Sequence, residues 1–525
     1  MNPEAFANQP SLRRHLGAAA VRGLKKNWFR TVFIDAFAGD KALKGGMLLA
    51  AAWELSAWLK KHTPAKRVGL VLPPGLGAAV ANLACVLVDK TPVNLNFTAG
   101  RGLNEASIRQ AEIATVLTAA AMQAKVKDFP WPQDCVDLKE LLQSLPKWRI
   151  LLRWVVGLLL PACLLSRAIG VPERGGDAEA GLLFTSGSSG EPKGVVLTHR
   201  NILGNAAQFE VVLEGLPIRY LLGCLPIFHS FGFTVTLWWP ILGGLPVVTY
   251  VSPGETATLA EIIARHRVGL LLTTPTFLRH FLRKASAEQL APLVMAITGA
   301  EKLPNDLAEA FEAKFCVPAC QGFGMTEASP AVATNLPKPG MSRLGSVGKL
   351  FPGMAARIRD PQTGADLPQG QTGMLWLKGV NIFPGYLNDP ARTADVLEDG
   401  WYKTGDLGRL DADGFLFIEG RLTRFSKLGG EMVPHGTIEE HLAAAYPERG
   451  EDFHPVVIGI DDAGKGEALI VLSPSDIDVQ DLRQRLGSRG LPNLWIPRKV
   501  LVVPEIPRFA TGKVDLKKCQ ELARQ

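Results

Sequence analysis

Short apolar runs alternate with helical patterns over residues 30–330 of this 525-residue chain. The runs are rich in Leu and Val and fit strands that are buried on both faces of a sheet. We predict strands at Val68–Leu72, Gly181–Thr185, Leu222–Leu225, Val247–Tyr250, Leu270–Thr273 and Val294–Thr298, and helices at Leu259–His266 and Thr276–Lys284. The alternation predicts an α/β fold in which helices cover mostly parallel sheets.

The pattern changes after about residue 340 to short strands punctuated by Gly and Pro, as in residues 373–378. This texture is typical of a small antiparallel β unit. The residues after Gly420 have helical and strand patterns of their own, and they are numerous enough for a small α+β domain. We therefore expect a large N-terminal domain over residues 1–419 and a small C-terminal domain over residues 420–525, with a hinge near 420–424.

The composition is that of a globular chain, because 47% of the residues are apolar and 20% are charged. The 57 Lys and Arg exceed the 50 Asp and Glu and give a net charge of +7. This excess favours acidic partners such as nucleotides, acidic carrier proteins or anionic lipid, and it is too small to indicate nucleic acid. The seven cysteines form no CxxC pair, so we expect a reducing, cytosolic compartment, with Cys316 and Cys320 as buried thiols.

Residues 147–167 combine apolar, aromatic and basic side chains. The stretch Ile150–Ser166 is shorter than the roughly 20 apolar residues that a membrane span needs, and Arg153 and Pro161 interrupt it. An integral membrane transporter is therefore not expected. One interpretation is a helix that lies in the interface of an anionic membrane, and the other is a buried helical hairpin. A second basic segment, residues 13–30, is interpreted as a solvated helix face.

A loop of glycines and hydroxyl side chains follows the predicted strand that ends at Thr185. It reads Thr185-Ser-Gly-Ser-Ser-Gly-Glu-Pro-Lys-Gly194. Glycines let the backbone approach a phosphate closely, the hydroxyls add hydrogen-bond donors, and Lys193 adds a positive charge. Pro192 stands where a Walker A loop needs glycine, so this is not a Walker A loop. A flexible Gly/Ser hairpin is the structural alternative.

This loop resembles the phosphate loop of the adenylate-forming enzymes, which include acyl-CoA synthetases, luciferases and nonribosomal adenylation domains. Further motifs follow in the order of that family: Gly299-Ala-Glu301, Gly322-Phe-Gly-Met-Thr-Glu327, Tyr402-Lys-Thr-Gly-Asp406, Gly420-Arg421, Gly429-Gly-Glu431 and Thr511-Gly-Lys513. The resemblance spans residues 180–513 and implies a ligase that uses ATP and Mg²⁺. It also implies a mobile C-terminal domain that rotates between an adenylating and a thioester-forming arrangement.

The resemblance implies roles for individual residues of this chain. Glu327 would hold Mg²⁺, which prefers hard oxygen ligands, Thr326 would donate to phosphate, and Lys513 would bridge the acyl carboxylate and the ribose. His229, in the segment Pro226–Phe233, would sit beside the acyl carboxylate, with a packed histidine as its structural alternative. The nucleotide would be bound by Thr185, Ser186, Gly187, Ser188, Ser189, Gly190, Lys193, Gly299, Ala300, Glu301, Gly322, Phe323, Gly324, Asp406 and Arg421.

Within this set, Phe323 would stack on adenine, and Asp406 would accept hydrogen bonds from the ribose hydroxyls with support from Arg421. Each of these residues alone also has an ordinary structural explanation, so only the joint pattern indicates the function. The chain departs from the family at two positions. Thr423 stands where many relatives carry Asp or Lys, and Asp515 stands where relatives often carry Arg.

Five segments are similar to the synthetase half of the bacterial bifunctional 2-acylglycerophosphoethanolamine acyltransferase/acyl-[acyl-carrier-protein] synthetase. They are Pro92–Gly100, Leu225–Phe233, Thr298–Lys302, Arg424–Met432 and Lys465–Ala468. The similarity implies a carbon–sulfur ligase that joins a fatty acid to holo-acyl carrier protein at the cytoplasmic face of the inner membrane. The sequence shows no HxxxxD acyltransferase motif, so we expect any acyltransferase on a separate chain.

The apolar residues near His229 favour a fatty acid as the acyl substrate. Phe228, Phe231, Phe233, Trp238 and Trp239 could line an apolar tunnel or belong to the core. A long-chain fatty acid–CoA ligase is the alternative within the class, because CoA is an anion as well. A nucleotide-binding homologue without catalysis is the alternative from another class.

Overall fold

The structure, a computed structural model, describes residues 3–186, 191–428, 431–450, 453–462, 466–508 and 514–524. The chain divides into two units. The first consists of Met1–Ala356, Leu377–Tyr402 and Ala412–Phe417, and the second of Arg357–Trp376, Lys403–Asp411 and Ile418–Gln525. The second unit thus takes two stretches that the expected division near residue 420 places in the large domain.

The largest sheet has nine strands in the order β15-β14-β13-β12-β11-β9-β10-β1-β2. From β13 to β1 neighbouring strands run parallel, and the outer strands pair antiparallel. The strands are β1 (Thr31–Asp35), β2 (Lys41–Lys44), β9 (Leu221–Gly223), β10 (Val247–Thr249), β11 (Leu270–Thr273), β12 (Met295–Thr298), β13 (Ala319–Gly324), β14 (Ala331–Thr334) and β15 (Lys349–Leu350).

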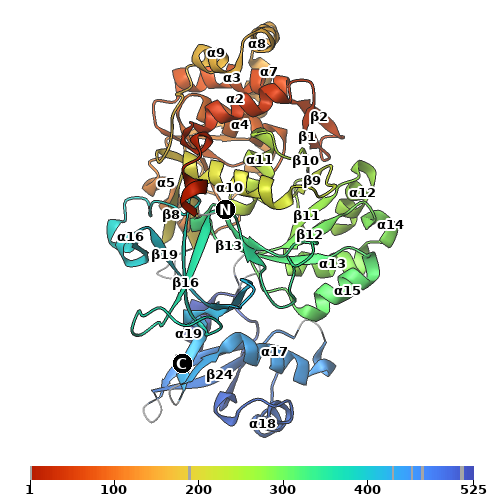
Figure 1. Ribbon diagram of the computed structural model, residues 1–525, viewed down its shortest axis with the longest axis vertical. Coiled ribbons are helices and arrows are strands. Elements are labelled where there is room, and N and C mark those ends of the chain that lie inside the picture. Colours follow the sequence, from red (N-terminus) through yellow and green to blue (C-terminus); the bar gives the residue numbers. More distant parts are fainter. Residues whose placement is uncertain are drawn as a thin grey trace. The chain divides into compact units, whose positions relative to one another are not determined.

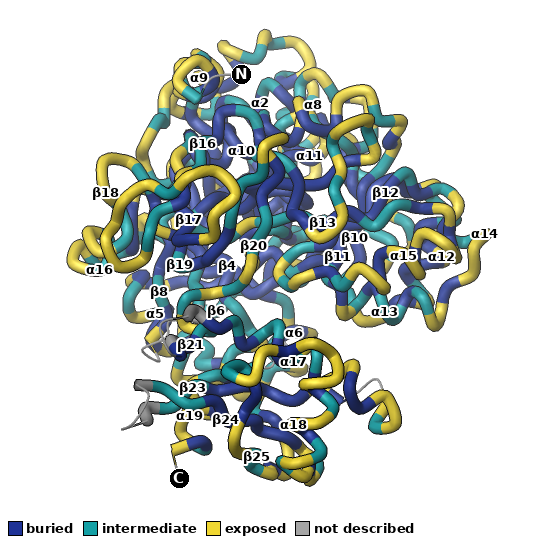
Figure 2. The backbone as a smooth tube through the Cα atoms, turned by 60° about the horizontal axis from the view of Figure 1, so that its bottom comes forward, coloured by how far each residue is buried: buried dark blue, intermediate teal, exposed yellow. Residues whose placement is uncertain are grey.

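Helices cover this sheet, and their apolar side chains form a core with those of the strands (Figure 1). They include α10 (His199–Leu213), α12 (Thr256–His266), α13 (Pro275–Lys284) and α15 (Asn305–Phe315). Ile263 of α12, Phe281 of α13 and Phe311 of α15 pack in one cluster with Leu271 and Ala296 of the sheet. β11 and β12 are buried over their whole length, in the dark blue interior of Figure 2, as expected for continuous apolar runs.

A second sheet of the first unit has six strands in the order β6-β5-β3-β4-β7-β8. It is parallel except for the antiparallel pair β7·β8. Its strands are β3 (Arg67–Leu70), β4 (Thr91–Asn94), β5 (Thr115–Thr118), β6 (Asp134–Asp137), β7 (Glu179–Ser186) and β8 (Pro192–Thr198). The predicted strands and helices of both sheets are confirmed, and the fold is α/β with mostly parallel sheets.

The basic segment at 13–30 combines a buried apolar face with exposed basic side chains. It contains α2 (Leu16–Lys26), most of which is buried, and its Lys25 ammonium donates to the carbonyl oxygens of Gly157 and Leu158 at 2.5 and 2.7 Å. The apolar face of α2 packs on α3 (Gly45–His62) and α4 (Leu76–Leu87), whereas Arg13, Lys26 and Arg30 of the segment are exposed, as expected for a solvated basic face.

Residues 147–169 form a helical hairpin of α8 (Lys147–Leu159) and α9 (Ala162–Ile169). Large apolar side chains of α8 are exposed, among them Leu159 at 75%. The interpretation as a buried hairpin is therefore wrong. In the described part of the chain, no helix combines the length and the apolar character that crossing a bilayer requires.

A sheet in the order β16-β17-β19-β18, with β20 paired to β19, confirms the predicted small β unit. Its strands are β16 (Met354–Arg359), β17 (Gly373–Gly379), β18 (Leu397–Glu398), β19 (Trp401–Leu410) and β20 (Leu416–Arg421). Cys320 is buried as predicted, but Cys316 is exposed, because it forms the left-handed turn that ends α15.

The second unit contains a sheet in the order β22-β21-β24-β23, with β25 paired to β24. Its elements are β21 (Phe425–Leu428), β22 (Glu431–Pro434), β23 (Val456–Asp462), β24 (Gly466–Ser473), β25 (Lys499–Val502), α17 (His435–Ala445), α18 (Val479–Ser488) and α19 (Leu516–Arg524). Alternate residues of β23 face opposite sides: Val457 packs with Leu442 of α17, and Ile458 packs with Cys519 of α19. Helices thus cover both faces of this sheet.

Candidate functional site

The predicted phosphate loop connects β7 to β8. This antiparallel pair places Thr185 opposite Lys193 and Ser186 opposite Pro192. The structure describes the backbone of Ser186 but not its side chain. Gly187, Ser188, Ser189 and Gly190, the tip of the predicted loop, lie outside the described residues.

A segment of the first unit runs beside β8 and brings Tyr386 to Lys193. The amide of Leu387 donates to the carbonyl of Gly194 at 2.7 Å, and the amide of Val196 donates to the carbonyl of Gly385 at 3.3 Å. The Lys193 ammonium lies over the Tyr386 ring, 5.3 Å from its centroid. This cation–π contact holds the lysine at the base of the loop.

Thr326 and Glu327 lie in η3 (Thr326–Ala328), a short 3-10 helix that follows β13. The Tyr386 hydroxyl donates to the Glu327 carboxylate at 2.9 Å, and the Phe383 amide donates to the Glu327 carbonyl at 2.9 Å. Burial, together with the adjacent Glu327 carboxylate, raises the pKa of Tyr386 far above its ordinary value, so the phenol stays a donor. Sequence reasoning missed Tyr386, although it directly follows a glycine in a Gly/Pro-punctuated segment.

The oxygen atoms at this point fit a hard divalent cation. The Thr326 hydroxyl lies 3.3 Å from the hydroxyl of Ser230, and the Glu327 carboxylate is only partly buried. Carboxylate and hydroxyl oxygens are the donor types that Mg²⁺ prefers. Glu327 is therefore suited to hold Mg²⁺.

The predicted adenine residues come together at the carboxyl edge of the parallel sheet. Gly299, Ala300 and Glu301 follow β12, and Gly322, Phe323 and Gly324 end the neighbouring β13. A methyl group built on Gly299 would lie 3.9 Å from the Gly322 carbonyl oxygen and 3.7 Å from the Phe231 ring. Ligands of open α/β sheets bind outside this edge.

Ala300 and Glu301, two of the predicted adenine residues, differ from their neighbours in backbone conformation and in side-chain contacts. Ala300 adopts a left-handed backbone conformation with φ of 70°, which is uncommon for a residue with a side chain. The Glu301 carboxylate accepts a hydrogen bond from the Thr276 hydroxyl at 2.8 Å. Glu301 is thereby oriented by the helix α13 that follows β11.

The acyl-site candidates divide into exposed and buried side chains. His229 is exposed, with its ring 4.7 Å from that of Phe228, so the alternative of a packed histidine is wrong. Phe233, Trp238 and Trp239 are buried in the core of the first unit. The indole of Trp239 donates to the Glu210 carboxylate at 3.1 Å.

Asp406 and Arg421 belong to the second unit and pair with each other. The Arg421 Nε lies 3.2 Å from the Asp406 Oδ1. The Asp406 side chain is 6% exposed and that of Arg421 is 68% exposed, so a buried carboxylate meets a solvated guanidinium. Lys513 and the rest of the motif Thr511–Lys513 lie outside the described residues.

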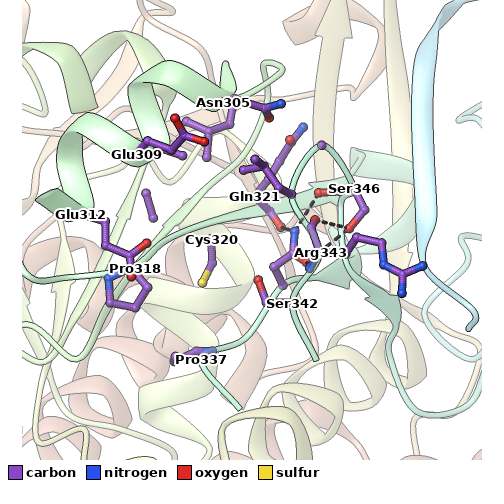
Figure 3. Close-up of a pocket in the computed structure, with 16 residues that line it drawn as sticks. Asn305, Glu309, Glu312, Pro318, Cys320, Gln321, Pro337, Ser342, Arg343 and Ser346 are labelled. Carbon is purple, nitrogen blue, oxygen red and sulfur yellow. Dashed lines mark hydrogen bonds between the residues drawn. The ribbon is translucent and has the colours of Figure 1, made fainter. Parts of the chain in front are cut away.

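A cavity of 330 Å³ lies between α15 and the loop at 342–346 (Figure 3). Glu309 and Glu312 border it on one side, and on the other the Arg343 amide donates to the Asn335 side chain at 2.9 Å. Its wall includes the start of β13, whereas the adenine candidates end that strand. The cavity is thus separate from the site described above.

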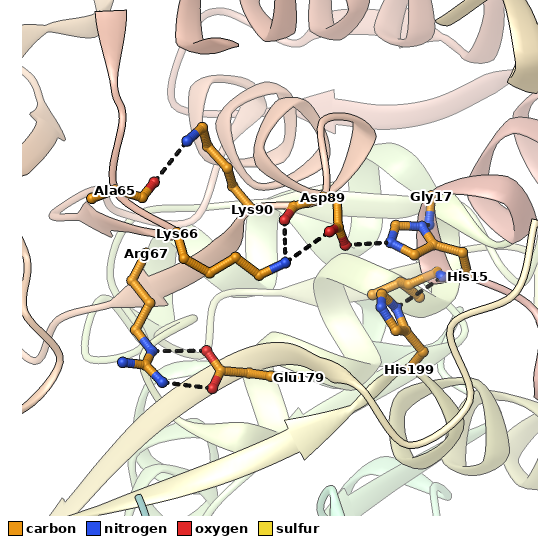
Figure 4. Close-up of polar contacts among 10 residues, drawn as sticks. His15, Gly17, Ala65, Lys66, Arg67, Asp89, Lys90, Glu179 and His199 are labelled. Atoms are coloured by element: carbon orange, nitrogen blue, oxygen red, sulfur yellow. Dashed lines mark hydrogen bonds and ion pairs between the residues drawn. The ribbon is translucent and has the colours of Figure 1, made fainter. Parts of the chain in front are cut away.

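A polar cluster joins parts of the chain that are distant in sequence (Figure 4). The rings of His15 and His199 lie 4.0 Å apart, and the His15 Nε2 lies 3.2 Å from Asp89, which also pairs with Lys66. Each Nδ1 accepts a backbone amide of the first turn of α2. Both neutral rings therefore carry their proton on Nε2 and offer no lone pair to a metal, so this cluster positions α2.

The fold and the edge-of-sheet site define an α/β enzyme of the adenylate-forming class. The AMP-binding enzyme family matches residues 25–387, and the chain belongs to this family. It is 31% identical to the sulfoacetate–CoA ligase of Cupriavidus necator over 348 residues, which are 65% of this chain and 66% of that protein. It is 32% identical to the long-chain-fatty-acid–CoA ligase of Bacillus subtilis over 347 residues, which are 63% of this chain and 60% of that protein.

The matched region spans slightly less than two thirds of these curated relatives. Among solved structures, the chain resembles ATP-bound MatB from Rhodopseudomonas palustris with a TM-score of 0.79 and 25% identity. That similarity covers 97% of this chain and 99% of the other. The fold of the second unit is therefore shared with that structure as well.

Proposed function

We propose that this protein is a ligase that activates a fatty acid with ATP and transfers the acyl group to the phosphopantetheine thiol of holo-acyl carrier protein. The observation that supports this most is the contact of Tyr386 with both Lys193 and Glu327. It ties the exit of the predicted phosphate loop, in the six-stranded sheet, to the predicted metal ligand, which follows β13 of the nine-stranded sheet.

In the first half-reaction, a carboxylate oxygen of the fatty acid attacks the α-phosphorus of ATP, and the bond to pyrophosphate breaks. Both reactants are anions, so catalysis consists of positioning and charge neutralisation. Lys193 stabilises phosphate charge, and Thr326 donates its hydroxyl to a phosphate oxygen. Mg²⁺, when bound by Glu327, supplies further neutralisation of the phosphates.

The remaining proposed roles concern the nucleotide and the acyl group. Phe323 stacks on adenine, the backbone of Gly299–Glu301 borders it, and Asp406 accepts hydrogen bonds from the ribose hydroxyls. His229 lies beside the acyl carboxylate. Lys513 bridges the carboxylate and the ribose, and the hinge at 420–424 turns the C-terminal domain between the half-reactions.

In the second half-reaction, the thiol sulfur attacks the acyl carbonyl, a carbon–sulfur bond forms and AMP leaves. The net charge of +7 favours an acidic carrier protein, and a separate acyltransferase would use the product. The similarity to a long-chain-fatty-acid–CoA ligase favours CoA as the second candidate acceptor. We further propose that the protein works peripherally at the cytoplasmic face of a membrane, where its lipid substrate resides.

The test has two parts. ATP–pyrophosphate exchange with palmitate should occur in the wild type and fall by about a hundredfold or more in Glu327→Gln. Glu309→Gln on the exposed face of α15 is the matched control and should keep full exchange. Thioester formation is then counted with holo-acyl carrier protein or with CoA. Preference for CoA would identify CoA as the acyl acceptor and the protein as a fatty acid–CoA ligase. Absence of exchange across a series of fatty acids would contradict the proposed ligase activity.

A further inference from the structure

Helix α8 turns its apolar side chains away from the protein. Trp148, Leu151, Leu152, Val155 and Leu158 recur at steps of three and four residues, so they form one stripe along the helix. Their exposed fractions range from 66% for Trp148 to 36% for Leu158. An amphipathic surface helix normally buries such a stripe. Here the usual arrangement is inverted.

The opposite side of α8 is fixed to the protein by polar contacts. The Arg153 guanidinium pairs with the buried carboxylate of Glu54 and donates to the Trp53 carbonyl. Gly157 lies so close to Trp28 that a methyl group there would be 2.4 Å from the indole. These contacts dock α8 on α3 and on Trp28, which follows α2, so the apolar stripe faces outward.

Neighbouring residues extend the stripe into a wider surface. Leu159 and Leu164 are exposed at 75% and 46% at the turn between α8 and α9. Phe29, exposed at 60%, lies 5.9 Å from the ring of Trp154. We call this surface the hairpin face, and it consists of Phe29, Trp148, Leu151, Leu152, Val155, Leu158, Leu159 and Leu164. Figure 1 shows α8 and α9 at one outer end of the first unit, beyond α2 and α3.

The charges around the hairpin face have one sign. Residues 141–172 contain no Asp or Glu. Lys147 and Arg167 are exposed on the two helices, and Lys26 and Arg30 are exposed on either side of the Phe29 turn. An apolar face bordered by Lys and Arg is the pattern of helices that lie in an anionic membrane interface.

A second copy of the chain fits this surface less well. A symmetric dimer through the hairpin face would bring the two basic borders together, because both copies use the same patch. Like charges at such a contact oppose association. An anionic bilayer instead offers hydrocarbon to the leucines and negative headgroups to the border.

We propose that the hairpin face docks the protein on anionic lipid bilayers, with α8 lying in the plane of the interface. This inference deepens the membrane association named under the proposed function and does not depend on which acceptor takes the acyl group. The exposed Trp148 reaches the headgroup level, where indoles are favoured, and Lys147 beside it meets the lipid phosphates.

Vesicle sedimentation with the full chain tests the proposal. Wild-type protein should bind vesicles of equal parts phosphatidylglycerol and phosphatidylcholine, and bind pure phosphatidylcholine far less. Leu151→Asp combined with Leu158→Asp should lower binding by about tenfold or more, since both sites are exposed and each change removes apolar contact. Leu344→Asp, an equally exposed leucine outside the hairpin face, is the matched control and should bind like wild type.

Several outcomes would overturn the proposal. They are absent binding by the wild type, equal binding of neutral vesicles, and unchanged binding by the double variant. A wild-type dimer that the double variant converts to monomer would assign the face to a second copy. ATP–pyrophosphate exchange is measured on the same samples with a short, water-soluble fatty acid. If the double variant loses vesicle binding but keeps exchange, the substitutions have affected docking and not catalysis. If the wild type binds vesicles but shows no exchange, the proposed ligase activity is contradicted and the docking proposal is not.

Discussion

The phenol of Tyr386 donates a hydrogen bond to the Glu327 carboxylate at 2.9 Å. The same ring lies beneath the Lys193 ammonium, 5.3 Å away. Lys193 follows a strand-to-strand loop of the second-largest sheet, and Glu327 follows β13 of the largest sheet. Tyr386 therefore fixes the distance between a cation and a carboxylate that two different sheets supply.

Tyr386→Phe should keep the ring under Lys193 and remove only the donor to Glu327. Hydrogen bonds to charged groups contribute about 1.5–3 kcal/mol, so the Mg²⁺ concentration for half-maximal ATP–pyrophosphate exchange should change by about tenfold or more. Tyr386→Leu should lose both contacts and also raise the KM for ATP. An Mg²⁺ dependence identical to wild type in Tyr386→Phe would show that the hydroxyl has no positioning role.

Parallel strands were the most predictable part of the fold. β11 and β12 are buried on all their residues, so each reads as an uninterrupted apolar run with limits close to those predicted. Two of the motifs, residues 299–301 and 322–324, lie at the carboxyl edge of this sheet, and their roles in nucleotide binding stay predictions. The sequence did not predict Tyr386 as a site residue. Its contacts depend on the pairing of residues near 386 with β8, almost two hundred residues earlier in the chain, and no local pattern indicates such a pairing.

The sequence also did not predict which side of α8 faces solvent. Periodicity predicts a stripe of Trp148, Leu151, Leu152 and Val155, but not whether the stripe faces inward or outward. The deciding residue is Arg153, which points inward because α3 provides the buried carboxylate of Glu54. A helix whose only central charge finds a buried partner must turn its leucines to solvent.

Arg153→Ala should destabilise the first unit more strongly than an ordinary surface substitution. It leaves the carboxylate of Glu54, 4% exposed, without its nearer guanidinium, and breaking such a buried pair costs about 3–5 kcal/mol. The double variant Glu54→Gln with Arg153→Met should recover most of that loss, since no charge is then buried. Guanidinium unfolding of the full chain measures both. Equal destabilisation in the single and double variants would contradict this account.

The His15–His199 cluster predicts acid sensitivity. Burial, and then the neighbouring His15, lower the pKa of His199 from 6.5 to about 3, so the folded protein keeps it neutral. The unfolded chain takes up the proton first as the pH falls, so this contribution to stability is full above about pH 6.5 and is lost progressively towards pH 3. One such proton contributes a slope of at most ~1.4 kcal/mol per pH unit.

His199→Gln should flatten this pH dependence, because its carboxamide can accept the Leu16 amide without titrating. Unfolding midpoints in urea between neutral and acidic pH provide the measurement. His62→Gln on the exposed end of α3 is the control and should keep the wild-type slope. A His199→Gln curve parallel to wild type would place the acid sensitivity elsewhere.

The proposed contact of Asp406 with the ribose can be tested by changing the nucleotide instead of the protein. A charged carboxylate that accepts both ribose hydroxyls should make the wild type prefer ATP over 2′-deoxy-ATP by about tenfold or more in kcat/KM for exchange, because one charge-assisted hydrogen bond is lost. Asp406→Asn keeps the size of the side chain and weakens both acceptors, so its preference should shrink towards unity while its activity with 2′-deoxy-ATP falls less than with ATP. Arg421→Met should reduce activity with both nucleotides equally, since its guanidinium, 68% exposed, pairs with Asp406 rather than reading the ribose. If Asp406→Asn keeps the full wild-type preference, the ribose is bound by other residues and Asp406 serves only its ion pair.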